Sequence, residues 1–303
     1  MKHYLELFIL GLPFAGLFAM LGTGVVMIYR ASKILTLAQG AIAMFTAYIL
    51  YQLNNKPNGP GTHGYGIPLP LALPLAIVFA GLMGYAIERF LLRPLRDRAV
   101  LVSVIMTVGI LSGLTGLAGI IWSYDRQEAP KLTPTGQTHF FGITLGYDQL
   151  TIIAMSVVIM LGVVYLFRRT TLGIAMRAVA DDRRAALLMG IPADRVSSLT
   201  WIIGTILAGI AGILLSPLLQ LQPLQLTLIS IPAYAAVLFG GLSNLARMTI
   251  GATLVGVLYS EVPALPVIKS HDFPGTPELA IFLAVIVFMF VTGKSTQLQE
   301  EEI

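Results

Sequence analysis

Charged residues in this chain are spaced so that they leave six long uncharged stretches. These are residues 7–29, 34–55, 57–87, 99–124, 149–167 and 196–246. A helix that crosses the hydrocarbon core of a bilayer, about 30 Å thick, needs about 20 apolar residues, and every stretch but 149–167 exceeds that length. Charged residues are 11% of the chain and hydrophobic residues 56%, whereas soluble domains average about 25% charged residues. The pattern predicts a membrane protein and excludes a soluble enzyme or a nucleic-acid-binding protein.

The stretches predict an all-α, polytopic helical bundle that forms one transmembrane domain over residues 1–303, with eight or nine crossings, of which we favour nine. The first stretch is interpreted as a retained helix, because its apolar run exceeds the roughly 7–15 residues of a signal peptide. The stretch 196–246 is too long for one crossing, and Pro217 and Pro223 predict a break inside it. Residues 232–246 form either a short crossing or a re-entrant hairpin.

The basic residues predict which side of the membrane each loop faces. With the N-terminus outside and nine crossings, 14 of the 19 Lys and Arg residues lie on the inner side. With a re-entrant hairpin the number is 13. An inner excess of Lys and Arg is the usual determinant of orientation. The net charge of +4 therefore indicates basic loops at a negatively charged membrane surface.

The inner loop at about 168–196 is longer than most helix–helix connections, and long loops are usually functional or disordered. Apolar and charged residues alternate in it at helical spacing, which predicts a short amphipathic helix that begins with Thr171 as its N-cap and stops at Gly190 before Pro192. This helix either lies on lipid headgroups or docks into a cytoplasmic partner. Two acidic residues beside two arginines suit a protein groove better than an anionic lipid surface.

Three segments resemble one family of transporters. Residues 171–218, TLGIAMRAVADDRRAALLMGIPADRVSSLTWIIGTILAGIAGILLSPL, are similar to the signature region of the branched-chain amino-acid ABC importer permeases. Residues 29–48, YRASKILTLAQGAIAMFTAY, and 88–122, ERFLLRPLRDRAVLVSVIMTVGILSGLTGLAGIIW, resemble earlier parts of the same family in the same order. Residues 240–256 also resemble the family, but Ala246 or Arg247 stands where it usually has a further glycine.

The resemblance implies a permease of the bacterial cytoplasmic (inner) membrane for branched-chain amino acids or small amides such as urea. It implies as partners two ABC ATPase subunits, a second similar permease or another copy of this chain, an external substrate-binding protein and membrane lipid, but no nucleic acid. ATP would bind the partner subunits, and this chain would bind no cofactor, in agreement with its lack of a G-x-x-x-x-G-K-[ST] motif. The inner loop would be the coupling helix of an alternating-access cycle, with the coupling residues Thr171, Gly173, Arg177, Ala178, Asp181, Asp182, Arg183 and Gly190.

Polar residues inside the uncharged stretches are candidates for the substrate path. Glu261 is the strongest, because an ionisable group in a membrane segment is a functional hypothesis by default, although a place near the outer end would leave it simply solvated. Gln39, Thr107 and Asn244 are weaker candidates. The four histidines show no metal-ligand spacing, and no catalytic set is recognisable, so we expect neither a metal nor catalysis.

Small residues recur at helical spacing in two stretches: Gly109, Gly113, Gly116 and Gly119, and then Gly204, Ala208 and Gly212. Such stripes allow helices to approach closely in lipid, either as static packing or as a sliding seam.

Two other functions stay open at this point. One is an ion-coupled secondary transporter of a small polar solute, which would favour ionisable groups near the midplane and inverted-repeat halves. The other is a membrane scaffold that transports nothing.

Overall fold

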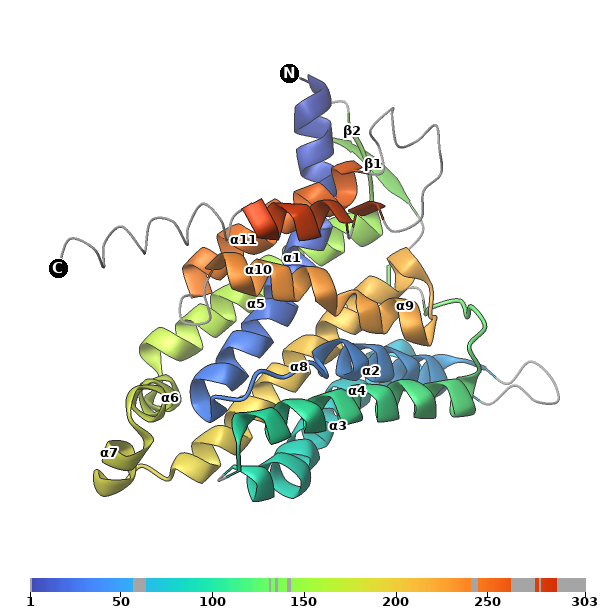
Figure 1. The fold of residues 1–303 in the computed structure, drawn as a ribbon. Coiled ribbons are helices and arrows are strands. Elements are labelled where there is room, and N and C mark those ends of the chain that lie inside the picture. The colour runs from blue at the N-terminus through green and yellow to red at the C-terminus, as the bar shows by residue number, and fades with distance from the viewer. Residues whose placement is uncertain are drawn as a thin grey trace, which may run out of the picture.

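The computed structural model is a bundle of helices with one small β-hairpin (Figure 1). It describes residues 2–56, 64–96, 98–130, 132–133, 136–140, 143–240, 245–262, 276–277 and 279–287. The elements are α1 (Lys2–Ser32), α2 (Gln39–Asn54), α3 (Leu69–Ala86), a π-helical turn η1 (Ile87–Leu92), a 3₁₀ turn η2 (Arg93–Leu95), α4 (Val100–Trp122), β1 (Gln137–Phe140), β2 (Ile143–Gly146), α5 (Tyr147–Arg169), α6 (Thr171–Asp181), α7 (Arg183–Leu188), α8 (Ala193–Leu219), α9 (Pro223–Leu228), α10 (Ser230–Gly240) and α11 (Leu245–Glu261).

Six helical stretches within the described ranges are long and apolar enough to cross a membrane. They are Phe8–Ser32, Leu69–Leu95, Leu101–Trp122, Tyr147–Arg169, Ala193–Leu219 and Pro223–Gly240. The predicted class, an all-α polytopic membrane protein, is confirmed. The first uncharged stretch is part of a continuous helix, α1.

The centre of the bundle is formed by α1, α2 and α8, which pack on one another and on the surrounding helices. The largest side chains that are fully buried come mainly from these three helices, among them Phe18, Tyr48 and Trp201. By contrast, α4 and α5 bury only 17% and 22% of the residues in their apolar stretches. Their other side chains form the surface that lipid or another protein chain covers, so they are the outer helices of this chain.

The second uncharged stretch, residues 34–55, is long enough for one helix, but only its second part is helical. Residues 33–38 run non-helically from the end of α1, and α2 starts only at Gln39. Lys33 has a positive φ of 57°, which reverses the chain after α1. The amide of Leu37 is held by the hydroxyl of Thr107 on α4 at 3.3 Å. Irregular backbone at membrane depth needs such internal partners, because lipid supplies none.

The break predicted inside residues 196–246 is confirmed. Helix α8 ends at Leu219, and Gln220 takes a positive φ of 62°. Leu221 then pairs with Gln127 through two backbone hydrogen bonds of 2.9 Å. The short helices α9 and α10 follow. These bonds tie the break to the loop before the β1–β2 hairpin, where sequence analysis predicted no strand.

The number of crossings stays a prediction. Helices α2 and α11 have 16 and 17 residues, about 24 and 26 Å at 1.5 Å per residue, which is less than the bilayer core. Much of the chain after α11, from residue 263 onward, lies outside the described residues. The orientation of the bundle in the membrane is likewise still a prediction.

Candidate functional site

The inner loop begins with a sharp turn between α5 and α6. The side chain of Thr170 caps α6, because its Oγ1 accepts a hydrogen bond from the amide of Gly173 at 3.1 Å. The sequence-based choice of Thr171 as the cap is therefore wrong by one residue. A Cβ atom on Gly173 would lie 2.4 Å from the carbonyl oxygens of both Leu166 and Phe167. Only glycine allows α6 to fold back this closely on the end of α5.

The predicted single amphipathic helix is instead two helices that break at Asp182. This residue has extended backbone angles (φ −147°, ψ 109°). Its carboxylate accepts hydrogen bonds from the amides of Arg184 at 2.7 Å and Ala185 at 3.1 Å. An Asp side chain satisfies the free amides at a helix start in this way. Asp182 thus caps α7, which gives it a local structural role besides any contact with a partner.

One face of the α6–α7 pair packs on the bundle. Met176, Val179 and Ala186 are buried, and they join a cluster with residues of α1, α5 and α8. The burial of this face fixes the helix pair to the ends of three long helices, so that a displacement of the pair would be transmitted to them.

The end of α7 points away from the bundle, at the lower left of Figure 1. Leu188 and Met189 are 88% and 82% exposed, and Leu187 is half exposed. Gly190 then reverses the chain with a φ of 81°, as the predicted helix stop requires. These three apolar residues, Leu187–Met189, form what we call the α7 tip. The tip could not be recognised in the sequence, because its residues look like the buried face of one longer helix.

The other predicted coupling residues lie in different surroundings. Asp181 is exposed and Ala178 is half buried. Arg177 turns back toward the bundle, where its guanidinium donates to the carbonyl oxygen of Phe167. Of the predicted coupling set, therefore, Asp181 and Asp182 face outward, whereas Arg177 faces the chain itself.

Arg183 belongs to an ionic cluster around Asp194, in the first turn of α8. The Asp194 carboxylate pairs with Arg183 of α7 and with Arg93 of η2. It also pairs with Arg96 at 2.7 Å. The cluster joins α7 and the start of α8, which are neighbours in sequence, to η2, about 100 residues earlier. It thereby connects the helix pair to the end of α3 through η1 and η2.

Arg96 continues this cluster into the protein interior. It pairs at 3.0 Å with Glu88, whose side chain is only 1% exposed. The second carboxylate oxygen of Glu88 accepts a hydrogen bond from Ser198 at 2.6 Å. A buried carboxylate is stable only when it is paired and hydrogen-bonded in this way. Neither Glu88 nor Asp194 was among the residues predicted from the sequence, although the position of Glu88 at the edge of an apolar stretch was a signal for it.

Two of the predicted path residues lie close together in the core. Gln39, the first residue of α2, is fully buried, and its Nε2 donates to the carbonyl of Gly204 on α8 at 2.8 Å. Its Oε1 has no hydrogen-bond partner within the described part of the chain. Thr107 is also fully buried and holds the non-helical segment 33–38 through Leu37. Both residues therefore flank the point where the chain re-enters the core.

The other two path candidates are not brought to this point. Glu261 is the last residue of α11 and is half exposed. It lies one turn beyond Val257, which packs on Gly11 near the start of α1, whereas Gln39 adjoins Gly24 in the second half of α1. Asn244 lies outside the described residues.

Comparison with known proteins gives consistent matches over nearly the whole chain. The family model described as "Branched-chain amino acid transport system / permease component" matches residues 7–292. The chain is 27% identical over 260 residues to the high-affinity branched-chain amino acid transport system permease protein BraD of Pseudomonas aeruginosa, covering 84% of this chain and 85% of BraD. It is 25% identical to the corresponding permease LivH of Escherichia coli, covering 95% and 94%. It is also 26% identical to the fructose import permease protein FruF of Bifidobacterium longum, covering 90% and 73%.

Proposed function

The chain belongs to the family of branched-chain amino acid transport system permease components, and from this premise we propose that it is the membrane subunit of an ABC importer driven by two separate ATPase subunits. The proposed substrates are branched-chain amino acids, because the names of BraD and LivH specify them. Small amides such as urea have no comparable support. An ion-coupled mechanism is not favoured, because the relatives are permeases of transport systems with several components.

The observation that carries the ATPase partnership is the α7 tip. Leu188 and Met189 are adjacent, apolar and more than four-fifths exposed. Their exposure to water is unfavourable, and burial in a partner's groove would lower the free energy. The tip stands at the end of a helix pair whose other face is packed on α1, α5 and α8. A partner that moved the tip would therefore move the ends of these helices, which is what coupling of ATP hydrolysis to transport requires.

In the complete importer, a second permease of the same family or another copy of this chain would complete the path. An external binding protein would deliver the substrate. Asp181 and Asp182 would set the register of the ATPase contact by charge, since charged pairs contribute more to specificity than to affinity.

The test is to replace the α7 tip with polar residues in the double variant L188S/M189S. We expect ATPase co-purification and substrate uptake to fall at least about tenfold, because several apolar contacts worth about 1 kcal/mol or more each are lost. The matched control is L224S on α9, another exposed leucine, placed far from α7 in Figure 1. This control should keep both activities.

Two results would contradict the proposal. If L188S/M189S inserts into membranes and still binds the ATPases at the level of the unmodified chain, the tip is not the docking element. If the chain alone, without ATPases, takes up substrate in response to an ion gradient, the importer assignment itself is wrong. A third variant, D181N, tests the charge contribution without disturbing the cap that Asp182 provides for α7.

A further inference from the structure

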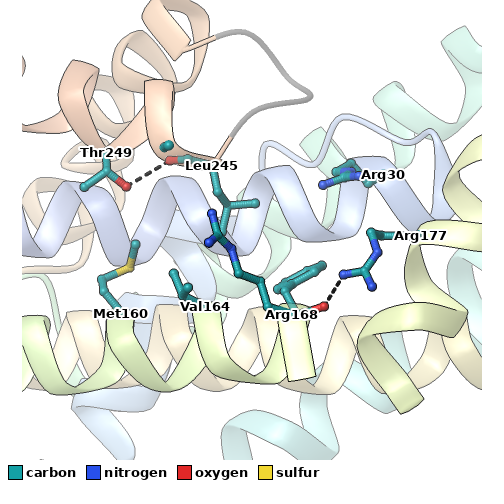
Figure 2. Close-up of a pocket in the computed structure, with 9 residues that line it drawn as sticks. Arg30, Met160, Val164, Arg168, Arg177, Leu245 and Thr249 are labelled. Atoms are coloured by element: carbon teal, nitrogen blue, oxygen red, sulfur yellow. Dashed lines mark hydrogen bonds between the residues drawn. The ribbon is translucent and has the colours of Figure 1, made fainter. Parts of the chain in front are cut away.

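A basic cavity of about 270 Å³ opens at the end of the bundle where α1, α5 and α6 meet (Figure 2). Arg30 of α1, Arg168 of α5 and Arg177 of α6 line it, and Phe167 forms part of its wall. The residues described around this cavity include no acidic side chain. Figure 2 shows Arg30 and Arg177 on one side of this space and the Arg168 guanidinium on the other, beside Leu245, with Arg177 donating to the carbonyl oxygen of Phe167. Three like charges that line one cavity repel one another, and an anion bound between them would offset this repulsion.

A second cavity, of about 300 Å³, continues from the first along the bundle. The two share Met160, Val164 and Thr249 in their linings, so they form one groove between α1, α5 and α11. The second cavity is almost entirely apolar, and it extends along α5 as far as Ile153. The groove thus has a triply basic end and a long apolar remainder.

The length of the apolar part matches one leaflet of a bilayer. Ile153 and Val164 are 11 positions apart on α5, which corresponds to about 16 Å of helix at 1.5 Å per residue. Half the hydrocarbon core of a bilayer is about 15 Å. Arg30 and Arg168 lie within the last three residues of α1 and α5, so they stand where both helices leave the apolar region.

We propose that this groove binds an anionic phospholipid, with its phosphate among Arg30, Arg168 and Arg177 and one acyl chain along α5. Guanidinium groups bind phosphate oxygens through charge-assisted hydrogen bonds, and basic pockets between membrane helices on the inner side suit anionic headgroups. A free phosphate would use the same arginines. The lipid is the chosen occupant because the apolar groove opens directly from the basic cavity. The site needs neither the proposed substrate nor the ATPases.

The headgroup is tested by native mass spectrometry of the full-length chain with added phosphatidylglycerol or phosphatidylcholine of identical acyl chains. We expect at least about tenfold stronger retention of phosphatidylglycerol, and a comparable loss of this retention in the variant R30Q/R168Q. The matched control is R169Q, which removes the neighbouring charge without altering the residues that line the cavity. Equal retention of both lipids, or an equal loss in R169Q, would overturn the proposal.

The acyl chain is tested by filling the groove with the variant T253W. Thr253 lines the apolar cavity, whereas its neighbour Leu254 is 53% exposed outside the cavity lining, so L254W is the control. We expect T253W to lower phosphatidylglycerol retention several-fold and L254W to leave it unchanged. The comparison of T253W with L254W tests for a bound lipid even if R30Q/R168Q fails to fold.

Two further outcomes would replace the lipid with another occupant. Inorganic phosphate that displaces phosphatidylglycerol at equal concentration would show a site for a free anion. Val157 lines the apolar cavity and is 53% exposed. Because the chain contains no cysteine, V157C introduces a single thiol that reports on the apolar groove. Formation of a disulfide-linked dimer through V157C in membranes would show that a second copy covers the groove. Either result would reject the lipid site, whereas lipid retention with no cross-link supports it.

Discussion

Helices α8 and α4 are almost equally apolar, with mean hydropathies of 2.3 and 2.1 in their apolar stretches, yet they occupy opposite kinds of position. In α8, 61% of these residues are buried within the chain, and in α4 only 17% are. In a soluble protein an apolar helix of this length would have to be buried on all sides. In lipid the surroundings are as apolar as the core, so hydropathy does not distinguish a central helix from an outer one.

The contacts made by the small residues distinguish the central helix α8 from the outer helix α4. A Cβ atom on Gly212 of α8 would lie 2.1 Å from the carbonyl oxygen of Ala43 on α2. On α4, a Cβ atom on Gly109, Gly113 or Gly116 would meet no described atom within 4 Å. The α8 stripe is therefore the contact surface of the core. On α4, Gly119 packs on Tyr124 of the following loop, and the other three glycines of the pattern face away from the described part of this chain.

The largest effect that separates the two helices should come from enlarging their glycines. We expect G212L to abolish folding, because backbone atoms of α2 cannot move aside as a side chain does, and overpacking alone costs about 1–3 kcal/mol or more. G113L should fold normally. The measurement is the yield of monodisperse protein in detergent. Equal yields for the two variants would contradict the central position of Gly212 and the outer position of Gly113.

A smaller difference should appear when a large side chain is shortened on each helix. Leu214 of α8 is 5% exposed and Ile120 of α4 is 83% exposed. We expect L214A to lower the free energy of unfolding by roughly 1–3 kcal/mol, less than the roughly 2–5 kcal/mol of soluble cores, because in lipid only the packing contribution is lost. I120A should change it by less than about 0.5 kcal/mol. Thermal unfolding in detergent compares them, and a larger loss in I120A would contradict the assigned positions.

Removing a charge at the start of each helix should have the smallest effect on stability. At the start of α8 it should nevertheless impair function. Asp194 at the start of α8 holds three arginines, whereas exposed Arg98 precedes α4 and has no ion pair described. Asp194 is 41% exposed, so D194N should cost little stability.

D194N should nevertheless loosen α7 from η2, and uptake per ATP hydrolysed should fall several-fold while the ATPases still co-purify. R98Q should leave this ratio unchanged. Reconstituted vesicles give uptake and hydrolysis together. Two results would exclude a positioning role for the carboxylate. One is a normal ratio of uptake to ATP hydrolysis in D194N, and the other is a ratio in D194E as low as that in D194N.

In the inner loop, the local sequence pattern predicted helical structure but not the positions of the caps and the break. Its amphipathic spacing predicted helix, and Gly190 predicted the end correctly. The choice between two adjacent threonines as N-cap depended on how closely α6 folds back on α5 at Gly173. Likewise, the break at Asp182 depended on its carboxylate reaching the amides of α7. Neighbouring residues offer the same chemistry, so only the backbone path selects between them.

The candidate site could be predicted only in part, for a different reason. The outward acids of the loop were recognisable because they are local. The Asp194 cluster was not, because it joins Arg93 and Arg96 to residues about 100 positions later, and no local pattern contains both. The α7 tip was missed because an exposed leucine and a buried one are identical in sequence.

Four properties could be predicted from the sequence: that the chain lies in a membrane, that it is helical, where the break after α8 falls and to which family it belongs. These properties follow from runs of apolar residues and from motifs that are continuous along the chain. Three others are visible only in the folded chain: which apolar helices form the centre, that α2 starts only after the chain has re-entered the core, and which arginines surround a cavity. In lipid, such choices depend on how closely surfaces fit, and closeness of fit is a property of pairs of distant segments rather than of any one segment.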